Sequence, residues 1–322
     1  MTYQQFLTEI QLQIHSLFDT DVTIQLHKIQ KNNGVTLDGL TILQKGCNIS
    51  PTIYLNDYYK ELFGHKVYKI SLNDYYKEYQ AGKSIHNIIL HIREIYRAYR
   101  PSSSVDVAFF TNFENVRHRI LFKLIHYQKN EELLKEIPHF RYLDFAVVFY
   151  CLLSSSSQGN ATILIRSTHL SYWNVSADEL YSYALENTPA QLPADFEPLM
   201  PLLNKLMPMP FPADSMEEES ETPLYVLTNK ARLYGASCIL YPNLLDSIAD
   251  KLTCDFYLIP SSIHEFLILP VLPGTCIQDL NAMIHEVNST QVEEEEILSD
   301  HAYFYSRSEK LLTSMPEERT TI

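Results

Sequence analysis

The order of predicted elements after residue 223 constrains the fold of this chain more than any other feature. Short runs rich in β-branched and aromatic residues predict strands at PLYVLT, ASCILY, DFYLIP, HEFLILPV and AYFYS. Two amphipathic segments between them predict helices, one beginning at Pro242 and one entered through Thr275 and Gln278. This β-β-α-β-β-α-β order predicts an antiparallel or mixed sheet with helices on one face.

A proline-rich and acidic run separates this region from the rest of the chain. Residues 200–223 read MPLLNKLMPMPFPADSMEEESETP, so prolines recur every few residues and acidic residues follow. Because proline lacks the amide hydrogen and clashes with the preceding helical turn, regular structure cannot continue through the run. We therefore predict an N-terminal α+β region over 1–205, a linker over 206–222, a C-terminal region over 223–312 and a flexible tail over 313–322.

The N-terminal region begins with a predicted helix and a predicted hairpin. Apolar residues recur at helical spacing from Thr2 to about Phe18, and Thr2 with Gln5 has the spacing of a capping box. The runs VTIQLHKIQ and GVTLDGLTILQ alternate β-branched and polar residues around Asn33 and Gly34. Such alternation around an Asn-Gly pair predicts a β-hairpin.

Five further segments complete the predicted elements. An apolar stripe of period 3.6 predicts a helix from Ser84 to Tyr99, and Ser176 with Glu179 has the spacing of a helix start. Strands are predicted at RILFKLIHY, FAVVFYCLL and ATILIRS. The chain is therefore predicted to be an α+β protein of two subdomains, with mixed, mostly antiparallel sheets and helices packed on one face.

Composition and targeting signals predict a folded cytoplasmic protein. The chain is 46% hydrophobic and 20% charged, which is typical of globular proteins. Its start lacks the basic and apolar regions of a signal peptide, and no run approaches the about 18 apolar residues of a membrane span. Five cysteines without a CxxC pair predict reduced thiols rather than disulfides or a zinc site.

The charge balance argues against a general nucleic-acid binder. The formal net charge is −14, whereas proteins that bind the phosphate backbone need clustered lysine and arginine. Residues 82–141 nevertheless hold ten Lys and Arg against six Asp and Glu. A local basic face in this segment keeps nucleic-acid association as the third hypothesis.

Motifs for cofactors and metals are missing from the sequence. The eight glycines form neither GxGxxG nor the phosphate loop GxxxxGK[ST], and AGKS at 81–84 is better explained as a helix cap. The pairs His264-Glu265 and His285-Glu286 lack the second histidine of HExxH. We therefore expect neither a cofactor nor a metal ion.

The stretch LIPSSIHEFLILP, residues 258–270, holds the weak catalytic candidates Ser262, His264 and Glu265. A strand that follows a tight Pro-Ser-Ser turn would place Ser262 and His264 on one face and Glu265 on the other. Glu265 could not then orient His264 as a triad acid does. The pattern favours a hairpin turn, with a hydrolase whose site assembles from scattered residues as the alternative.

Aromatic residues supply the remaining functional signals. The 22 tyrosines, many beside charged residues, favour a protein-binding surface. The single tryptophan, Trp173 in SYWNVS, is interpreted as a core anchor before a capped helix, with ligand stacking as the alternative. The segment IYLNDYYKE at 53–61 recurs as ISLNDYYKE at 70–78, which we interpret as a tandem duplication.

Several stretches resemble an uncharacterised bacterial family, a domain of unknown function of clostridial gut anaerobes. They are NNGVTLDGLTI, ISPTIYLNDYYKE with EYQAGKS, LTNKARLYGASCILYP, LIPSSIHEFLILP and EVNSTQV with LSDHAYFY. The resemblance covers about residues 20–310, and a remoter one links the chain to a second uncharacterised bacterial α+β family. Members look as though they carry one LNDYYKE copy, so LFGHKVYK would be an insertion. Neither family implies an activity or site residues.

These observations predict a binding protein rather than an enzyme. We expect a cytoplasmic protein-binding or regulatory accessory module without catalysis, whose partner is another protein. Neither nucleic acid nor a membrane is the expected partner. The hydrolase with Ser262, His264 and Glu265 is the alternative, because these residue types can supply a nucleophile, a base and an acid.

Overall fold

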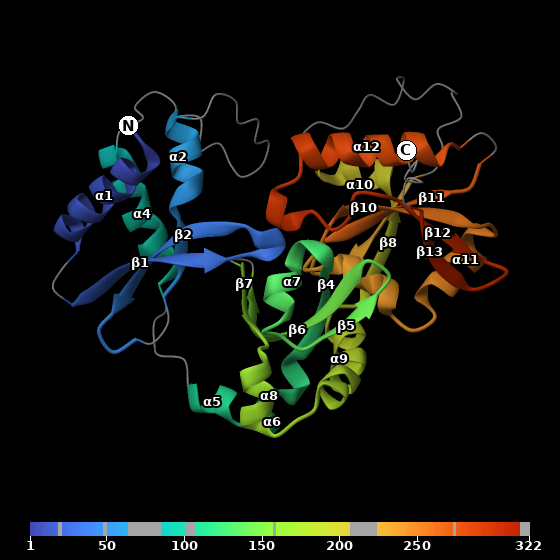
Figure 1. The fold of residues 1–322 in the computed structure, drawn as a ribbon, viewed down its shortest axis with the longest axis horizontal. Helices are drawn as coiled ribbons and strands as arrows, with labels where there is room; N and C mark the ends of the chain where they lie inside the picture. Colours follow the sequence, from blue (N-terminus) through green and yellow to red (C-terminus); the bar gives the residue numbers. More distant parts are fainter. Residues whose placement is uncertain are drawn as a thin grey trace. The chain divides into compact units, whose positions relative to one another are not determined.

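The computed structural model has helices and antiparallel sheets in two compact units (Figure 1). It describes residues 1–18, 21–47, 50–63, 85–100, 107–156, 159–206, 224–272 and 275–315. One unit comprises 1–31 and 35–108, and the other comprises 32–34 and 109–322. Every strand pairing among the described residues is antiparallel, which confirms the predicted α+β class.

The first unit packs helices against a three-stranded sheet of order β1-β2-β3. Its elements are α1 (Tyr3–Ile14), η1 (His15–Leu17), β1 (Val22–Gln30), β2 (Thr36–Gln44), β3 (Thr52–Tyr54), α2 (Leu55–Phe63) and α4 (Ile85–Tyr99). The predicted capping box is confirmed, since Thr2 accepts a hydrogen bond from Gln5 N and Gln5 accepts one from Thr2 N. The predicted hairpin is also confirmed, with Asn33 at φ 58° in its turn η2 (Asn32–Gly34).

The apolar faces of these elements meet in one core, as their sequence periods require. Residues three or four apart in α1 and α4 are buried against alternate residues of β2. The members that are at most 1% exposed include Phe6, Ile10, Ile14, Leu40, Ile42, Ile88, Ile89 and Ile92. The second LNDYYKE copy and the predicted helix cap Ser84 lie outside the described residues.

The second unit begins with a four-stranded sheet built around one long strand. β6 (Phe145–Ser156) pairs with β4 (Ile120–His126) on one side, and with β5 (His139–Tyr142) and then β7 (Gly159–Leu164) on the other. The predicted strands are thus confirmed here. Its short helical elements are α5 (Val107–Thr111), which spans the boundary with the first unit, α6 (Phe113–Val116), η3 (Arg117–Arg119), η4 (Gln128–Asn130), α7 (Glu131–Leu134) and α8 (Ser167–Trp173).

Helix α9 (Ala177–Gln191) packs along the edge of β4 that has no neighbouring strand, and its side chains form hydrogen bonds with backbone groups at that edge. The buried hydroxyl of Thr188 accepts a hydrogen bond from Phe122 N at 3.1 Å. The Asn187 amide donates to the carbonyl oxygens of Arg117 at 2.7 Å and Ile120 at 3.1 Å. Because an unpaired buried amide is costly, these side chains take the place of a neighbouring strand.

Substituting Thr188 tests this edge. We expect Thr188→Val to lower the free energy of unfolding by about 1–3 kcal/mol, because the isosteric change leaves Phe122 N without its acceptor. Urea titration followed by far-UV circular dichroism measures the change. Thr188→Ser keeps the hydroxyl and should cost less, so equal losses in the two variants would contradict this account.

The second sheet has six strands in the order β13-β12-β10-β11-β9-β8. They are β8 (Ala194–Pro198), β9 (Tyr225–Asn229), β10 (Phe256–Ser262), β11 (Glu265–Pro270), β12 (Tyr303–Ser306) and β13 (Leu311–Ser314). β8 precedes the predicted linker yet pairs with β9 after it, and β13 includes two residues of the predicted tail. The linker itself lies outside the described residues apart from its first residue, so the division built on it stays a prediction.

Helices pack on both faces of this sheet, and not only on one. Side chains of β10 and β11 alternate between a cluster with α12 (Ile277–Thr290) and the main core with α11 (Leu244–Leu252). The main core also joins the sheet to the four-stranded sheet. Two further short helical elements belong to the unit, α10 (Leu199–Leu206) and η7 (Glu294–Glu296). The predicted helix entry through Thr275 is corrected, because the cap residue of α12 is Cys276 and its side chain makes no capping bond.

The predicted strand ASCILY is wrong, since residues Gly235–Leu240 form a 3-10 helix, η6. Asn229 ends β9 by accepting hydrogen bonds from Ala231 N and Leu233 N and donating to Leu233 O. Tyr234 then adopts a left-handed backbone with φ 52°, which turns the chain back over the sheet end. Consecutive residues of η6 are buried, so their apolar run reflects burial on all sides and not strand alternation.

Candidate functional site

Ser262, His264 and Glu265 lie at the β10–β11 hairpin, as predicted, but the turn comes later than expected. Pro260 pairs with Phe266 within the ladder, Ser262 lies opposite Glu265, and the register shifts between Pro260 and Ser262. The extra residue of this bulge moves the turn to Ile263 and His264. The predicted alternation of His264 and Glu265 along one strand is therefore corrected, because His264 lies in the turn.

The three candidate side chains make separate contacts. Ser262 Oγ accepts a hydrogen bond from His264 N at 3.0 Å, and Ser261 Oγ donates to Glu265 Oε1 at 3.3 Å. The His264 ring stacks on Tyr234 with centroids 5.5 Å apart. The structure therefore brings the three residues to one turn but does not join their side chains in a hydrogen-bonded triad.

The His264 imidazole is held by the backbone. Its Nδ1 accepts a hydrogen bond from Tyr234 N at 3.1 Å, and its Nε2 lies 3.9 Å from Glu296 Oε1. A neutral ring that accepts at Nδ1 carries its hydrogen at Nε2, so no lone pair is free to take a proton from a serine. Burial lowers the pKa of His264, while the charge of Glu296 opposes that shift. A catalytic role for the three residues stays a prediction.

The lowered pKa of His264 makes stability depend on pH. The folded-state pKa of His264 lies below its unfolded value of about 6.5, so the unfolded state takes up a proton more readily. The histidine therefore leaves the free energy of unfolding unchanged well above pH 6.5 and lowers it as the pH falls below about that value. We expect the free energy of unfolding to fall between pH 7.5 and 5.5, and His264→Asn to remove up to about 1.4 kcal/mol per pH unit of that slope. Urea titrations across this range measure it.

The comparison must be made between variants, because other histidines share the effect. Burial also lowers the pKa values of four other histidines, His91, His126, His169 and His301. Each of them therefore also makes the free energy of unfolding of the parent protein fall as the pH falls. Identical slopes for the parent and His264→Asn would show that His264 takes up its proton equally in both states.

A second polar cluster, missed by the sequence analysis, joins the turn before β6 to the start of β12. The Tyr303 hydroxyl oxygen lies 2.7 and 2.8 Å from the two carboxylate oxygens of Asp144 and 2.7 Å from Ser299 Oγ. Ser299 Oγ donates to Asp144 at 3.2 Å and lies 3.4 Å from His301 Nδ1. We call these four residues the Asp144 cluster.

The Asp144 cluster has the residue types of a catalytic triad in an arrangement that does not serve one. The serine contacts Asp144 directly, and the nearest approach of His301 Nε2 to Asp144 is 3.8 Å. In a triad the histidine separates the acid from the serine. Ser299 is also only 1% exposed, so a substrate cannot reach it. The alternation of Ser299, His301 and Tyr303 was the available sequence signal, but Asp144 is distant in sequence.

Three of the six basic residues that 82–141 contributes to the second unit are paired with carboxylates, and the other three, Arg119, Lys123 and Arg141, lie over aromatic rings. Lys129 pairs with Asp300 at 3.0 Å, Lys135 pairs with Glu132, and Arg117 pairs with Glu114 at 3.2 Å. Ion pairs with neighbouring carboxylates reduce the positive field that phosphates require. Nucleic-acid association therefore stays a prediction without support from these contacts.

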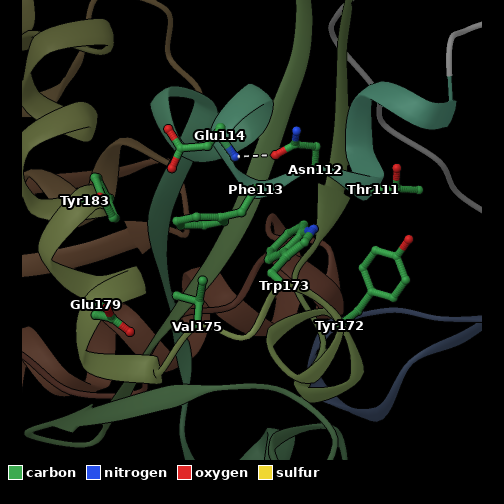
Figure 2. A pocket seen from close by; sticks show the side chains of 9 residues that line it. All are labelled: Thr111, Asn112, Phe113, Glu114, Tyr172, Trp173, Val175, Glu179 and Tyr183. Atoms are coloured by element: carbon green, nitrogen blue, oxygen red, sulfur yellow. Dashed lines mark hydrogen bonds between the residues drawn. The ribbon is translucent and has the colours of Figure 1, made fainter.

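A hollow of about 480 Å³ opens between α6, α8 and α9 (Figure 2). Aromatic side chains form much of its wall, and two carboxylates lie at its margin. Its lining consists of Thr111, Asn112, Phe113, Glu114, Tyr172, Trp173, Val175, Glu179 and Tyr183. It is largely open to solvent, so it is a surface depression and not an enclosed cavity. We call it the Trp173 hollow.

The aromatic wall is held in place by its own packing. The Trp173 indole is 9% exposed, and its Nε1 donates to Phe110 O at 3.0 Å. Phe113 lies between Trp173 and Tyr183, with ring centroids 5.5 Å from each (Figure 2). Tyr172 is 67% exposed beside this fixed wall. Trp173 is therefore a core residue, as predicted, whose edge also lines a surface hollow.

The two carboxylates are fixed by local structure. Glu179 Oε2 accepts hydrogen bonds from Ser176 N and Ser176 Oγ, both at 2.9 Å, which confirms the capping box predicted at this helix start. These bonds lower the pKa of Glu179, so its carboxylate is ionised at neutral pH. Glu114 is paired with Arg117, whose guanidinium also lies 5.8 Å from the Tyr183 ring centroid.

Among the described residues, no group of three or more His, Cys, Asp or Glu side chains is placed to hold a metal ion. None of the described helices combines the length and apolar character needed to cross a membrane.

The sequence profile of a family described as "Family of unknown function (DUF5688)" matches residues 3–69 and 64–307. The chain belongs to this family. No curated protein and no solved structure matches the chain. The two matched segments of the family overlap at 64–69, between the two LNDYYKE copies. That is where the sequence analysis predicts an insertion.

All the residues of the candidate sites fall within the longer segment that the DUF5688 profile matches. They comprise the Trp173 hollow, the Asp144 cluster and the β10–β11 turn. The family description assigns no activity to them. Function must therefore be argued from the geometry of these sites.

Proposed function

We propose that the protein is a binding module without catalytic activity, and that it recognises another protein through the Trp173 hollow. The observation that supports this proposal is the exposed Tyr172 in the lining of the hollow. The same lining contains the packed aromatic wall and the Glu179 carboxylate, which is fixed by Ser176. Tyrosine and tryptophan are enriched among the residues that dominate protein interfaces. A fixed wall also lowers the entropy lost on binding.

The hydrolase alternative has less support. The lone pair of His264 Nδ1 is taken by a backbone amide, and Ser262 Oγ accepts from the backbone rather than contacting the imidazole. Ser299 of the Asp144 cluster is closed to substrate. Binding through an open hollow needs none of these rearrangements.

Photo-crosslinking in the native host tests the proposal. A benzoylphenylalanine at position 172 should give a discrete crosslinked species that contains another protein, and a Phe113→Asp change should remove it. The same probe at position 99 is the matched control, because Tyr99 is 50% exposed and does not line the hollow. A product at 172 that contains only a second copy of this chain, or no product, would contradict the proposal.

We further propose that the protein is bacterial and cytoplasmic. The proposal is supported by the resemblance described above and by five cysteines that are all free, which fits a reducing compartment. Fractionation of the native host, with an antibody against the chain, tests the location. Recovery in the membrane or the culture medium would contradict it.

A further inference from the structure

We infer that the Trp173 hollow binds a lysine or arginine side chain of its partner. This inference rests on the proposed function, because it specifies which side chain the partner inserts. It is carried by the charge of the hollow, by its aromatic wall and by the contact that Arg117, outside the lining, makes with the wall residue Tyr183.

The charge of the hollow favours a cation. Its lining contains two carboxylates, Glu114 and Glu179, and no basic side chain. Arg117 offsets Glu114, but Glu179 has no ion pair among the described residues. Asp178 adds a further carboxylate in the first turn of α9, so the positive end of that helix is more than compensated.

Glu179 is preorganised to receive that cation. The Ser176 amide and hydroxyl occupy its Oε2 and fix the side chain against the start of α9. Its Oε1 makes no hydrogen bond within the part of the chain that the structure describes. A cation that approaches Oε1 therefore meets an ionised group whose side-chain entropy is already lost.

The aromatic wall fits the rest of such a side chain. The methylene stem of lysine or arginine packs on apolar surface while its charged head stays polar. Phe113 and Val175 supply that surface, and the exposed Tyr172 ring lies at the far end of the same hollow, beyond Trp173 (Figure 2). Aromatic faces attract cations within about 6 Å.

Arg117 shows the same combination within the chain. Its guanidinium lies 5.8 Å from the Tyr183 ring centroid, donates to the Tyr183 hydroxyl at 3.4 Å and pairs with Glu114. One side of the wall thus already holds a basic side chain between an aromatic ring and a carboxylate. On the Glu179 side the lining offers a partner a carboxylate and has no basic side chain of its own.

The single tryptophan makes a direct test possible, because tryptophan fluorescence reports only on Trp173. The full chain is titrated with acetylated, amidated tripeptides in which lysine, arginine, norleucine or glutamate stands between two glycines. We expect saturable changes with the lysine and arginine peptides, at affinities about fivefold or more above that of the norleucine peptide. The glutamate peptide should bind more weakly than the norleucine peptide.

Substitution of Glu179 assigns the effect to the hollow. Glu179→Gln keeps the capping interaction and removes the charge, so it should reduce lysine-peptide affinity to the level of norleucine. Glu186→Gln is the matched control, because it removes the same charge from an exposed position of the same helix outside the lining. It should leave affinity within about twofold of the parent.

The outcomes separate this inference from the proposed function. If norleucine binds as well as lysine, if Glu179→Gln has no effect, or if no peptide binds, the inference is wrong. The crosslink at position 172 would in those cases still decide whether the hollow binds a protein. Absence of a crosslinked partner protein at position 172 of the otherwise unchanged chain would overturn the proposed function itself.

Discussion

Replacing Gly235 with alanine should lower the free energy of unfolding by about 3 kcal/mol, because the added methyl group has no room. An alanine Cβ at this position would lie 2.5 Å from His264 O and 2.8 Å from Asn229 N, and closer still to Thr228 Oγ1. Two of these atoms belong to the backbone, so a change of rotamer cannot remove the contacts. Urea titration followed by Trp173 fluorescence measures the loss.

Gly39 offers a contrasting control. An alanine Cβ there would contact Ile29 Cδ1 closely and lie 2.8 Å from Thr52 Cγ2. Both are ends of side chains that can rotate, so Gly39→Ala should cost less than Gly235→Ala. Unfolding of both variants is compared by circular dichroism. Equal losses of the free energy of unfolding in the two variants would show that the backbone near Gly235 shifts to make room for the methyl group as easily as a side chain does.

This close approach also explains why the sequence predicts η6 wrongly. The run ASCILY has the β-branched and apolar residues of a strand, and nothing local distinguishes it from one. The turn at Asn229, the left-handed Tyr234 and the contact of Gly235 with β9 together send the chain across the sheet end. Each depends on tertiary neighbours, whereas the helix starts at Thr2 and Ser176 are local and were predicted correctly.

The candidate site was predictable only in its parts. The capping box of Glu179 and the buried position of Trp173 follow from local sequence. The convergence of the lining residues does not follow from local sequence, because all four strands of the first sheet of this unit lie between Phe113 and Tyr183 in the sequence. At the β10–β11 turn the hairpin was predictable, but the bulge after Pro260 shifted the side chains by enough to change their partners.

Asp144→Ala is expected to lower the free energy of unfolding by about 3 kcal/mol, because it removes the acceptor of a buried hydroxyl. Tyr303 is fully buried, and burial and the nearby Asp144 both raise its pKa, so it stays a neutral donor. Without Asp144, its remaining partner is Ser299. Asp144→Asn keeps a carbonyl oxygen at the same place and should cost about 1 kcal/mol. Urea titration at pH 7.5 measures both changes.

A double-mutant cycle with Tyr303→Phe identifies the interaction that is lost. If the carboxylate acts mainly by accepting from this hydroxyl, the two substitutions should be non-additive by about 1 kcal/mol or more. His301 gives an independent readout, since burial lowers its pKa and the charge of Asp144 opposes that shift. Asp144→Ala should therefore lower the His301 pKa further in an NMR titration. Additive stabilities and an unchanged His301 pKa would mean that Asp144 contributes through packing alone.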